Sequence, residues 1–104
     1  MAGKGQTRFQ VIDAFDHPHG GRILRLRLDA GDAPGVRDLR GRSLTLTGPR
    51  GEERTARVAG FPVSGGKVSD SRIRDTGRVD VLVEGSNGDL DAVDLSWTVG
   101  LSRG

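Results

Sequence analysis

The chain has 104 residues, which suits one domain and leaves no room for two of ordinary size. Hydrophobic residues make up 34% and aromatic residues 4%, so we expect a lean and mostly aliphatic core. Cysteine is absent, which excludes disulfides, thiolate metal sites and a cysteine nucleophile. The charges nearly cancel at a net +2, a value that permits binding to nucleic acid without being a strong sign of it.

The ends of the chain carry no targeting pattern. Residues 1–8 lack the apolar centre of a signal peptide, and no stretch reaches the ~20 apolar residues that span a bilayer. We therefore expect a cytoplasmic protein with no membrane partner. We expect flexible ends at 1–7 and 101–104, and a single domain over 8–100.

Alternation of apolar and polar residues is the dominant pattern, and it predicts strands with one buried face. Phe9–Phe15 is the first expected strand and Arg22–Leu28 the second. In the second strand, leucines alternate with Arg25 and Arg27, which places the leucines inside and the arginines outside. His17–Gly21 supplies the turn between them, with two glycines that are free to adopt positive φ.

The middle of the chain predicts a hairpin. Asp29–Arg42 is a long polar connection with one short turn of helix expected at Val36–Leu39. Ser43–Thr47 and Glu53–Phe61 are the third and fourth strands, and the Gly48–Gly51 turn joins them.

The last third of the chain is less regular. Pro62–Gly77 is weakly patterned, with a break at Gly65-Gly66 and a basic step at Arg72–Arg74, and neither it nor the rest of the chain shows a regular helical pattern. Arg78–Glu84 is the fifth strand, with its valines on one face, and Gly85–Asp89 is the turn that follows. Val93–Val99 alternates almost perfectly and is the sixth strand, with Trp97 on its apolar face.

Six short strands with glycine-rich turns predict an all-β domain, an antiparallel barrel that is closed or partly open. A closed barrel is favoured because closure removes the exposed edges of the sheet. The predicted core consists of Val11, Leu24, Leu26, Leu44, Leu46, Val58, Val81, Leu95 and Trp97.

A series of features follows one another over residues 8–100. Phe9–Phe15 has an apolar-x-apolar-x-Asp pattern ending in an aromatic residue, and Gly20–Leu24 is a glycine turn leading into a strand. Gly31–Leu44 is a Gly-Asp connection before a strand, Thr55–Val58 contains Ala-Arg-Val, and Arg74–Gly85 is a glycine-bearing lead-in to an apolar strand. This order resembles the second domain of translational GTPases such as elongation factor Tu.

The resemblance implies a six-stranded β-barrel and a role in contacting RNA or another protein. It does not extend to GTP hydrolysis, because the phosphate-binding pattern Gly-x-x-x-x-Gly-Lys-Ser/Thr is absent from the chain. The chain also departs from the family where Arg25 and Arg27 replace the usual glycine of the second strand, and in the length of Asp29–Arg42.

No catalytic or metal-binding pattern is present. His17 and His19 are the only histidines, and without a third histidine they are better explained as turn residues than as metal ligands. Gly85–Asp91 with Asp94 is rich in oxygen atoms but lacks the spacing of a calcium loop. No serine lies in Gly-x-Ser-x-Gly. We therefore expect no enzyme, no cofactor and no bound metal.

Arginine is the candidate functional residue, since it outnumbers lysine fourteen to two. This bias reflects either GC-rich codons or selection for bidentate contacts with phosphate. Arg25, Arg27 and Arg57 are expected on outer faces of strands and, with Arg40 and Arg42, would form a basic stripe for phosphate if their strands lie close together. The alternative is a solvated face on which acidic residues are interspersed.

The sequence therefore favours a binding module that contacts RNA, a ribonucleoprotein or a protein partner through its outer surface. The alternative is a structural or self-assembly domain with no nucleic-acid role, associating through an open barrel edge or the Asp29–Arg42 loop. Salt separates these two hypotheses, because phosphate binding weakens steeply with salt and apolar association does not.

Overall fold

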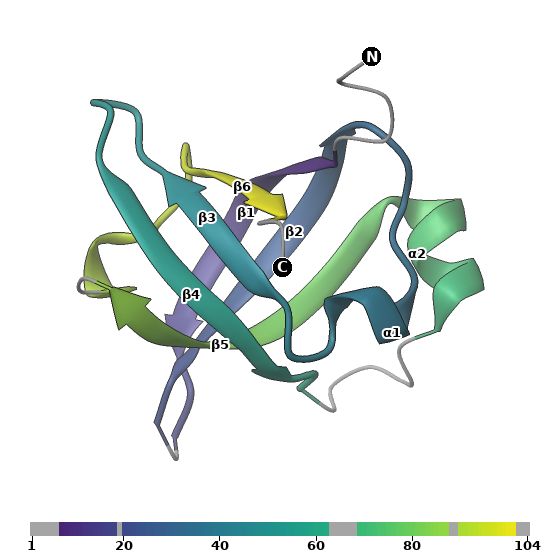
Figure 1. The fold of residues 1–104 in the computed structure, drawn as a ribbon, viewed down its shortest axis with the longest axis horizontal. Helices are drawn as coiled ribbons and strands as arrows, with labels where there is room; N and C mark the ends of the chain where they lie inside the picture. Colours follow the sequence, from purple (N-terminus) through teal and green to yellow (C-terminus); the bar gives the residue numbers. More distant parts are fainter. Residues whose placement is uncertain (1–6, 19, 63–68, 88–89, 102–104) are drawn as a thin grey trace.

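The computed structural model describes residues 7–18, 20–62, 69–87 and 90–101, in which six antiparallel strands form a closed barrel (Figure 1). The strands are β1 (Arg8–Asp16), β2 (Arg22–Ala30), β3 (Ser43–Thr47), β4 (Glu53–Gly60), β5 (Arg78–Asn87) and β6 (Thr98–Leu101), and the helices are α1 (Val36–Leu39), α2 (Asp70–Thr76) and the 3₁₀ helix η1 (Leu90–Ala92). Their order around the barrel is β1-β2-β5-β4-β3-β6. The predicted all-β barrel is confirmed in its closed form.

The interior is filled by the inward residues of the strands. Every predicted core residue except Leu95 is at most 4% exposed. Phe9, Leu39, Ile73 and Val99 join the same cluster, although they were not among the predicted core residues. Burying each of these large apolar side chains contributes roughly 1.5–3 kcal/mol to the stability of the fold. A core with few aromatic residues can therefore stabilise the barrel without disulfides.

A register shift in β1 decides which of its side chains reach the outer surface. Val11 pairs with Leu26 and Asp13 pairs with Arg25, so Ile12 is an extra residue in the ladder. Simple alternation after Val11 would have turned Asp13 into the core. The bulge at Ile12 instead places the Asp13 carboxylate on the outer face, opposite Arg25.

The β3–β4 hairpin agrees closely with the sequence. β3 has the predicted bounds, and β4 ends at Gly60, one residue before the predicted end. In the turn, Gly51 adopts a φ of +87°, and a Cβ atom at Gly48 would lie 2.9 Å from the Trp97 ring. The glycines are therefore required by the turn and by the close approach of the indole.

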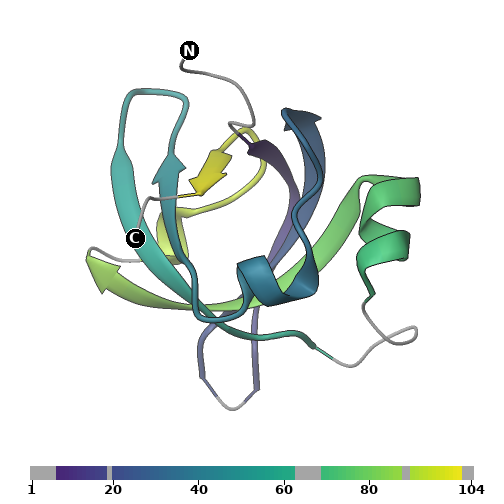
Figure 2. The same ribbon diagram turned by 45° about the vertical axis from the view of Figure 1, so that its right-hand side comes forward.

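The helices α1 and α2 lie in the right-hand half of Figure 1, and in Figure 2 α1 lies in front of the lower centre of the barrel and α2 at its right-hand edge. The short α1 confirms the predicted turn of helix, whereas α2 lies in the segment for which no helix was expected. The Ser69 hydroxyl caps α2 by accepting from the Arg72 amide at 3.2 Å, and Gly77 ends the helix with a φ of +69°. The prediction was wrong here because seven residues are too few to show a helical period.

The predicted sixth strand is wrong over most of its length. β6 begins only at Thr98, and Ser96 has a φ of +81°, which breaks the extended backbone before it. Val93 and Trp97 are buried as alternation implies, but Leu95 is 55% exposed. The left-handed residue interrupts the alternation, so the Leu95 side chain turns to solvent.

Other expectations are corrected at the ends of elements. β5 continues through Asn87, so Gly85–Asn87 is strand and not turn. β6 ends at Leu101, which pairs with Leu44, so strand pairing extends past residue 100.

Gly20 and Gly21 have positive φ, as predicted. His19, Gly88–Asp89 and the chain ends at 1–6 and 102–104 lie outside the described residues.

No helix within the described ranges is long and apolar enough to cross a membrane.

Candidate functional site

The predicted basic stripe depends on which strands are neighbours. Arg25 and Arg27 of β2 and Arg57 of β4 alternate with buried residues and point outward, as expected. However, β5 lies between β2 and β4 in the barrel. The outward side chains of β5 include Asp80 and Glu84, which pair in register with Arg25 and Arg57. Acidic residues therefore interrupt the stripe.

Arg25 is held by two carboxylates. Its Nε donates to Asp80 Oδ1 at 3.1 Å and its Nη2 to Asp80 Oδ2 at 3.3 Å, while Asp13 Oδ2 lies 3.9 Å from its Nη1. The hydrogen bonds and charge of Asp80 raise the pKa of Arg25. This guanidinium already has the bidentate partner that a phosphate would otherwise supply.

Arg57 is held more loosely. Its Nη2 lies 3.9 Å from Glu84 Oε1, and both side chains are about 60% exposed. An exposed pair at this distance contributes at most about 1 kcal/mol and exchanges readily with solvent. Arg57 is therefore compensated in charge without being fixed in position.

Arg27 stands in a different environment. It pairs in register with Arg78, the first residue of β5, and both side chains are exposed on the outer face. Neither side chain makes an ion pair or hydrogen bond within the described residues. Like charges directly opposite one another on a sheet are destabilising. We call Arg27 and Arg78 the basic rung, and Arg25 with Asp80 the paired rung.

Arg40 and Arg42 belong to the connection between α1 and β3. The Arg40 guanidinium lies over the Phe61 ring, 5.4 Å from its centroid, a cation–π contact. Arg42 is half-buried, and its carbonyl accepts from the Val58 amide at 2.9 Å, which ties the start of β3 to β4. These contacts place both arginines beside β4 and the residue that follows it, and not beside Arg25 and Arg27 on β2.

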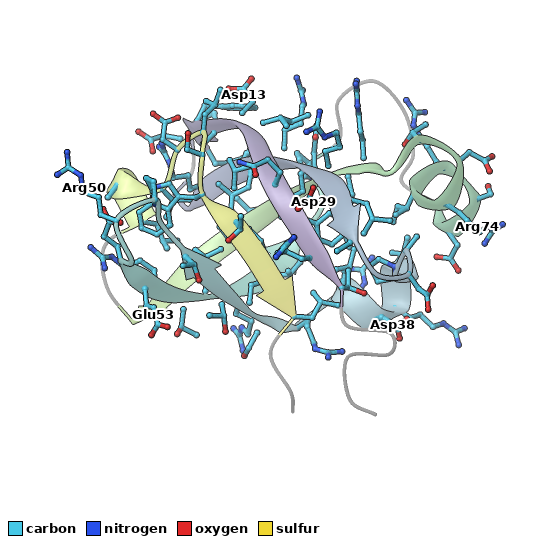
Figure 3. All side chains as sticks on the ribbon, turned by 90° about the horizontal axis from the view of Figure 1, so that it is seen from above. Asp13, Asp29, Asp38, Arg50, Glu53 and Arg74 are labelled. Atoms are coloured by element: carbon cyan, nitrogen blue, oxygen red, sulfur yellow. The ribbon has the colours of Figure 1, made fainter. Side chains whose placement is uncertain are left out.

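The rest of the surface carries mixed charge. Figure 3 shows labelled side chains of both signs around the barrel, including Arg50 and Glu53 on one side and Asp38 and Arg74 on the other. This arrangement agrees with a solvated face for most of the arginines. Arg78 was missed as a site residue because its opposition to Arg27 depends on the pairing of β2 with β5.

An apolar row lies beside the paired rung. Phe15 pairs with Ile23, and Ile23 pairs with Leu82, on the outer face of β1, β2 and β5. Ile23 faces outward and lies outside the core cluster, yet it is only 6% exposed, because it lies between Phe15 and Leu82 on the neighbouring strands. Phe15 remains 41% exposed, which leaves an apolar edge on this face.

The histidine turn forms no metal site among the described residues, where no group of three or more potential ligands comes together. The His17 amide donates to the Gly21 carbonyl at 3.0 Å, which closes the β1–β2 turn.

Comparisons with protein families, with curated proteins and with solved structures found no match to this chain.

Proposed function

We propose that this barrel is a binding module, and not an enzyme, that contacts the phosphate backbone of RNA through the basic rung. The supporting observation is the unpartnered opposition of Arg27 and Arg78 on adjacent strands, within the part of the chain that the structure describes. Cα atoms of directly opposed antiparallel residues lie roughly 4.5–5.5 Å apart, so one phosphate can reach both guanidinium groups. Charge-assisted hydrogen bonds to that phosphate would replace repulsion between the two arginines.

Contacts of this kind hold a nucleic acid in place without reading its bases. We therefore expect binding that depends strongly on salt and weakly on sequence. The proposal is in keeping with the expected role of a barrel that resembles the second domain of translational GTPases.

The test is a titration of labelled single-stranded and structured RNA with the Arg27→Ala/Arg78→Ala variant at two salt concentrations. A matched control is Arg37→Ala/Arg50→Ala, which removes the same charge from α1 and from the β3–β4 turn. We expect the first variant to lose most of its affinity at low salt. Its salt dependence should become shallower by roughly one unit of slope for each phosphate that the variant no longer binds.

The control double variant should stay close to wild type in both affinity and slope. The proposal fails if wild type binds no RNA more tightly than about 10⁻⁴ M at low salt, the weak end of non-specific binding. It also fails if the two double variants lose affinity equally, because net charge alone would then explain the binding.

Self-association is a second candidate function, favoured by the exposure of Phe15 and Leu95 at 41% and 55%. Apolar association of this kind would persist at high salt. Sedimentation of wild type and of Phe15→Ser/Leu95→Ser over a range of protein concentrations tests it. A monomer at all concentrations contradicts self-association.

A further inference from the structure

A cleft of about 320 Å³ lies on the outer surface of the barrel, across β1, β6 and β3. Its walls and floor include Arg8, Ala30, Thr45, Thr47, Thr98 and Gly100. The register explains how these residues meet, because Gly100 pairs with Arg8 on one side and with Thr45 on the other, and Thr98 pairs with Thr47. Apart from Thr7, which directly precedes β1, the lining residues therefore lie in strands: β1, β6 and β3, with Ala30 at the end of β2.

The hollow exists because its centre lacks a side chain. Gly100 lies between Arg8 and Thr45, and a Cβ atom built there would meet no atom within 4 Å. Nothing in the backbone conformation of Gly100 demands glycine, since its φ is not positive. The missing side chain keeps the floor open.

The chemistry of the cleft is that of hydroxyl groups. Thr47 and Thr98 face each other across β3 and β6, are half-buried, and make no side-chain hydrogen bond within the described residues. Each hydroxyl can donate one hydrogen bond and accept two. The charge at the rim is already compensated, because Arg8 Nη2 lies 3.0 Å from Asp29 Oδ2. These features suit a neutral, hydroxyl-bearing group better than a free anion.

The cleft adjoins the surface proposed for RNA. Ala30, which lines the cleft, is the last residue of β2, three residues beyond Arg27. At about 3.3 Å per residue, the cleft wall lies about 10 Å from the basic rung along the strand. A bound strand of a few nucleotides, comparable to the ~4-nucleotide lower limit for small nucleic-acid-binding barrels, would span both places.

We infer that the cleft takes a ribose of the bound strand, and that Thr47 and Thr98 hydrogen-bond its 2′-hydroxyl, so that the barrel prefers RNA to DNA. This inference rests on the proposed function. The 2′-hydroxyl both donates and accepts, as the threonine hydroxyls do, and it distinguishes RNA from DNA at such a site. The cleft volume is at the lower end of the roughly 300–1,000 Å³ found for small-ligand sites.

The test compares the affinities for RNA and DNA oligonucleotides of one sequence. Thr47→Val/Thr98→Val removes both hydroxyls but keeps the branched shape that suits a strand. We expect wild type to bind RNA more tightly, and the variant to lose roughly fivefold in RNA affinity for each hydrogen bond removed, with DNA affinity unchanged.

A second variant fills the cleft without touching the threonines. Gly100→Ala should weaken RNA binding, and Gly60→Ala in β4, where an added Cβ also meets no atom within 4 Å, is the matched control and should not. Thermal unfolding of all variants verifies that the barrel is intact.

The outcomes separate the two proposals. Equal wild-type affinity for RNA and DNA, or an RNA-to-DNA ratio that neither cleft variant changes, overturns ribose recognition while the basic rung still accounts for binding. If wild type binds neither nucleic acid, both proposals fall.

Discussion

Arg25 and Arg27 are two residues apart on one strand, point to the same face and have the same neighbouring strand. Arg25 meets Asp80 at 3.1 Å, whereas Arg27 meets Arg78. The identity and orientation of an arginine therefore do not decide whether it is available to a ligand. The residue opposite on the neighbouring strand does, and the paired rung and the basic rung can be separated by experiment.

The largest effect should come from the residue between these arginines. Leu26 is fully buried, so Leu26→Ala should lower the free energy of unfolding by about 2–5 kcal/mol. Arg27→Ala should change it by no more than about 0.5 kcal/mol, as surface substitutions generally do. Denaturant unfolding of both variants measures the difference. Comparable losses would mean that the inner and outer faces of β2 are not as described.

Giving Arg27 an acidic partner should lower the affinity for RNA and raise the stability of the barrel. Arg78→Glu places a carboxylate opposite Arg27, so the variant should gain about 0.2–1 kcal/mol of stability. Its RNA affinity should fall about tenfold or more, since a hydrogen bond to a charged group contributes about 1.5–3 kcal/mol. Filter binding measures the expected loss of RNA affinity, and thermal unfolding of the same preparation measures the expected gain in stability. Full RNA affinity in this variant would exclude the basic rung from the interface.

The reverse change should extend the basic surface. Asp80→Asn removes the negative charge that pairs with the Arg25 guanidinium and keeps the shape of the Asp80 side chain. We expect a severalfold gain in RNA affinity at low salt. Stability should fall by less than about 1 kcal/mol, because the Arg25 side chain is 43% exposed and solvent screens the pair. An unchanged affinity would limit the binding surface to the basic rung.

The smallest effect concerns acid stability in the β3–β4 turn. The Glu52 carboxylate accepts from its own amide and from the Arg50 amide, the latter at 2.8 Å, and these bonds lower its pKa. A lowered folded-state pKa adds stability above the ordinary glutamate pKa of about 4.3, and that stability disappears as pH falls through the folded value. Wild type should therefore lose more stability than Glu52→Gln between about pH 5 and pH 3.

Unfolding curves of the two proteins at several pH values measure this difference, and parallel pH profiles would contradict it. The Arg25 guanidinium itself adds no such pH dependence, because arginine stays charged at every accessible pH and the hydrogen bonds and charge of Asp80 raise its pKa further.

Local patterns predicted local structure well. β3 and its turn follow from Leu44, Leu46 and the glycines at 48 and 51, all within nine residues. Ser69 and Gly77 are visible as helix caps, but α2 between them is too short for periodicity to reveal it. The residues before β6 alternate regularly in sequence, but the positive φ of Ser96 breaks the extended backbone there, so the strand predicted from the alternation does not form.

The candidate site was predicted only in part, for a physical reason. Alternation correctly assigns Arg25, Arg27 and Arg57 to outer faces. It carries no information about which strand lies alongside, and β5 enters between β2 and β4 from far along the chain. The compensation of Arg25 and the opposition of Arg27 to Arg78 are properties of that long-range pairing.

The position of β5 between β2 and β4 also determines the order in which the barrel can assemble during folding. The β1–β2 and β3–β4 hairpins have short loops and can form early, but each leaves an unpaired edge until β5 joins them. β6 then closes the ring between β1 and β3. Because the pairings that close the barrel are distant in sequence, it should fold in milliseconds to seconds, as β-barrels dominated by non-local pairings do. During synthesis, the edges of β2 and β4 stay unpaired until β5 has emerged from the ribosome. The edges of β1 and β3 stay unpaired until β6, which ends at residue 101, has emerged as well.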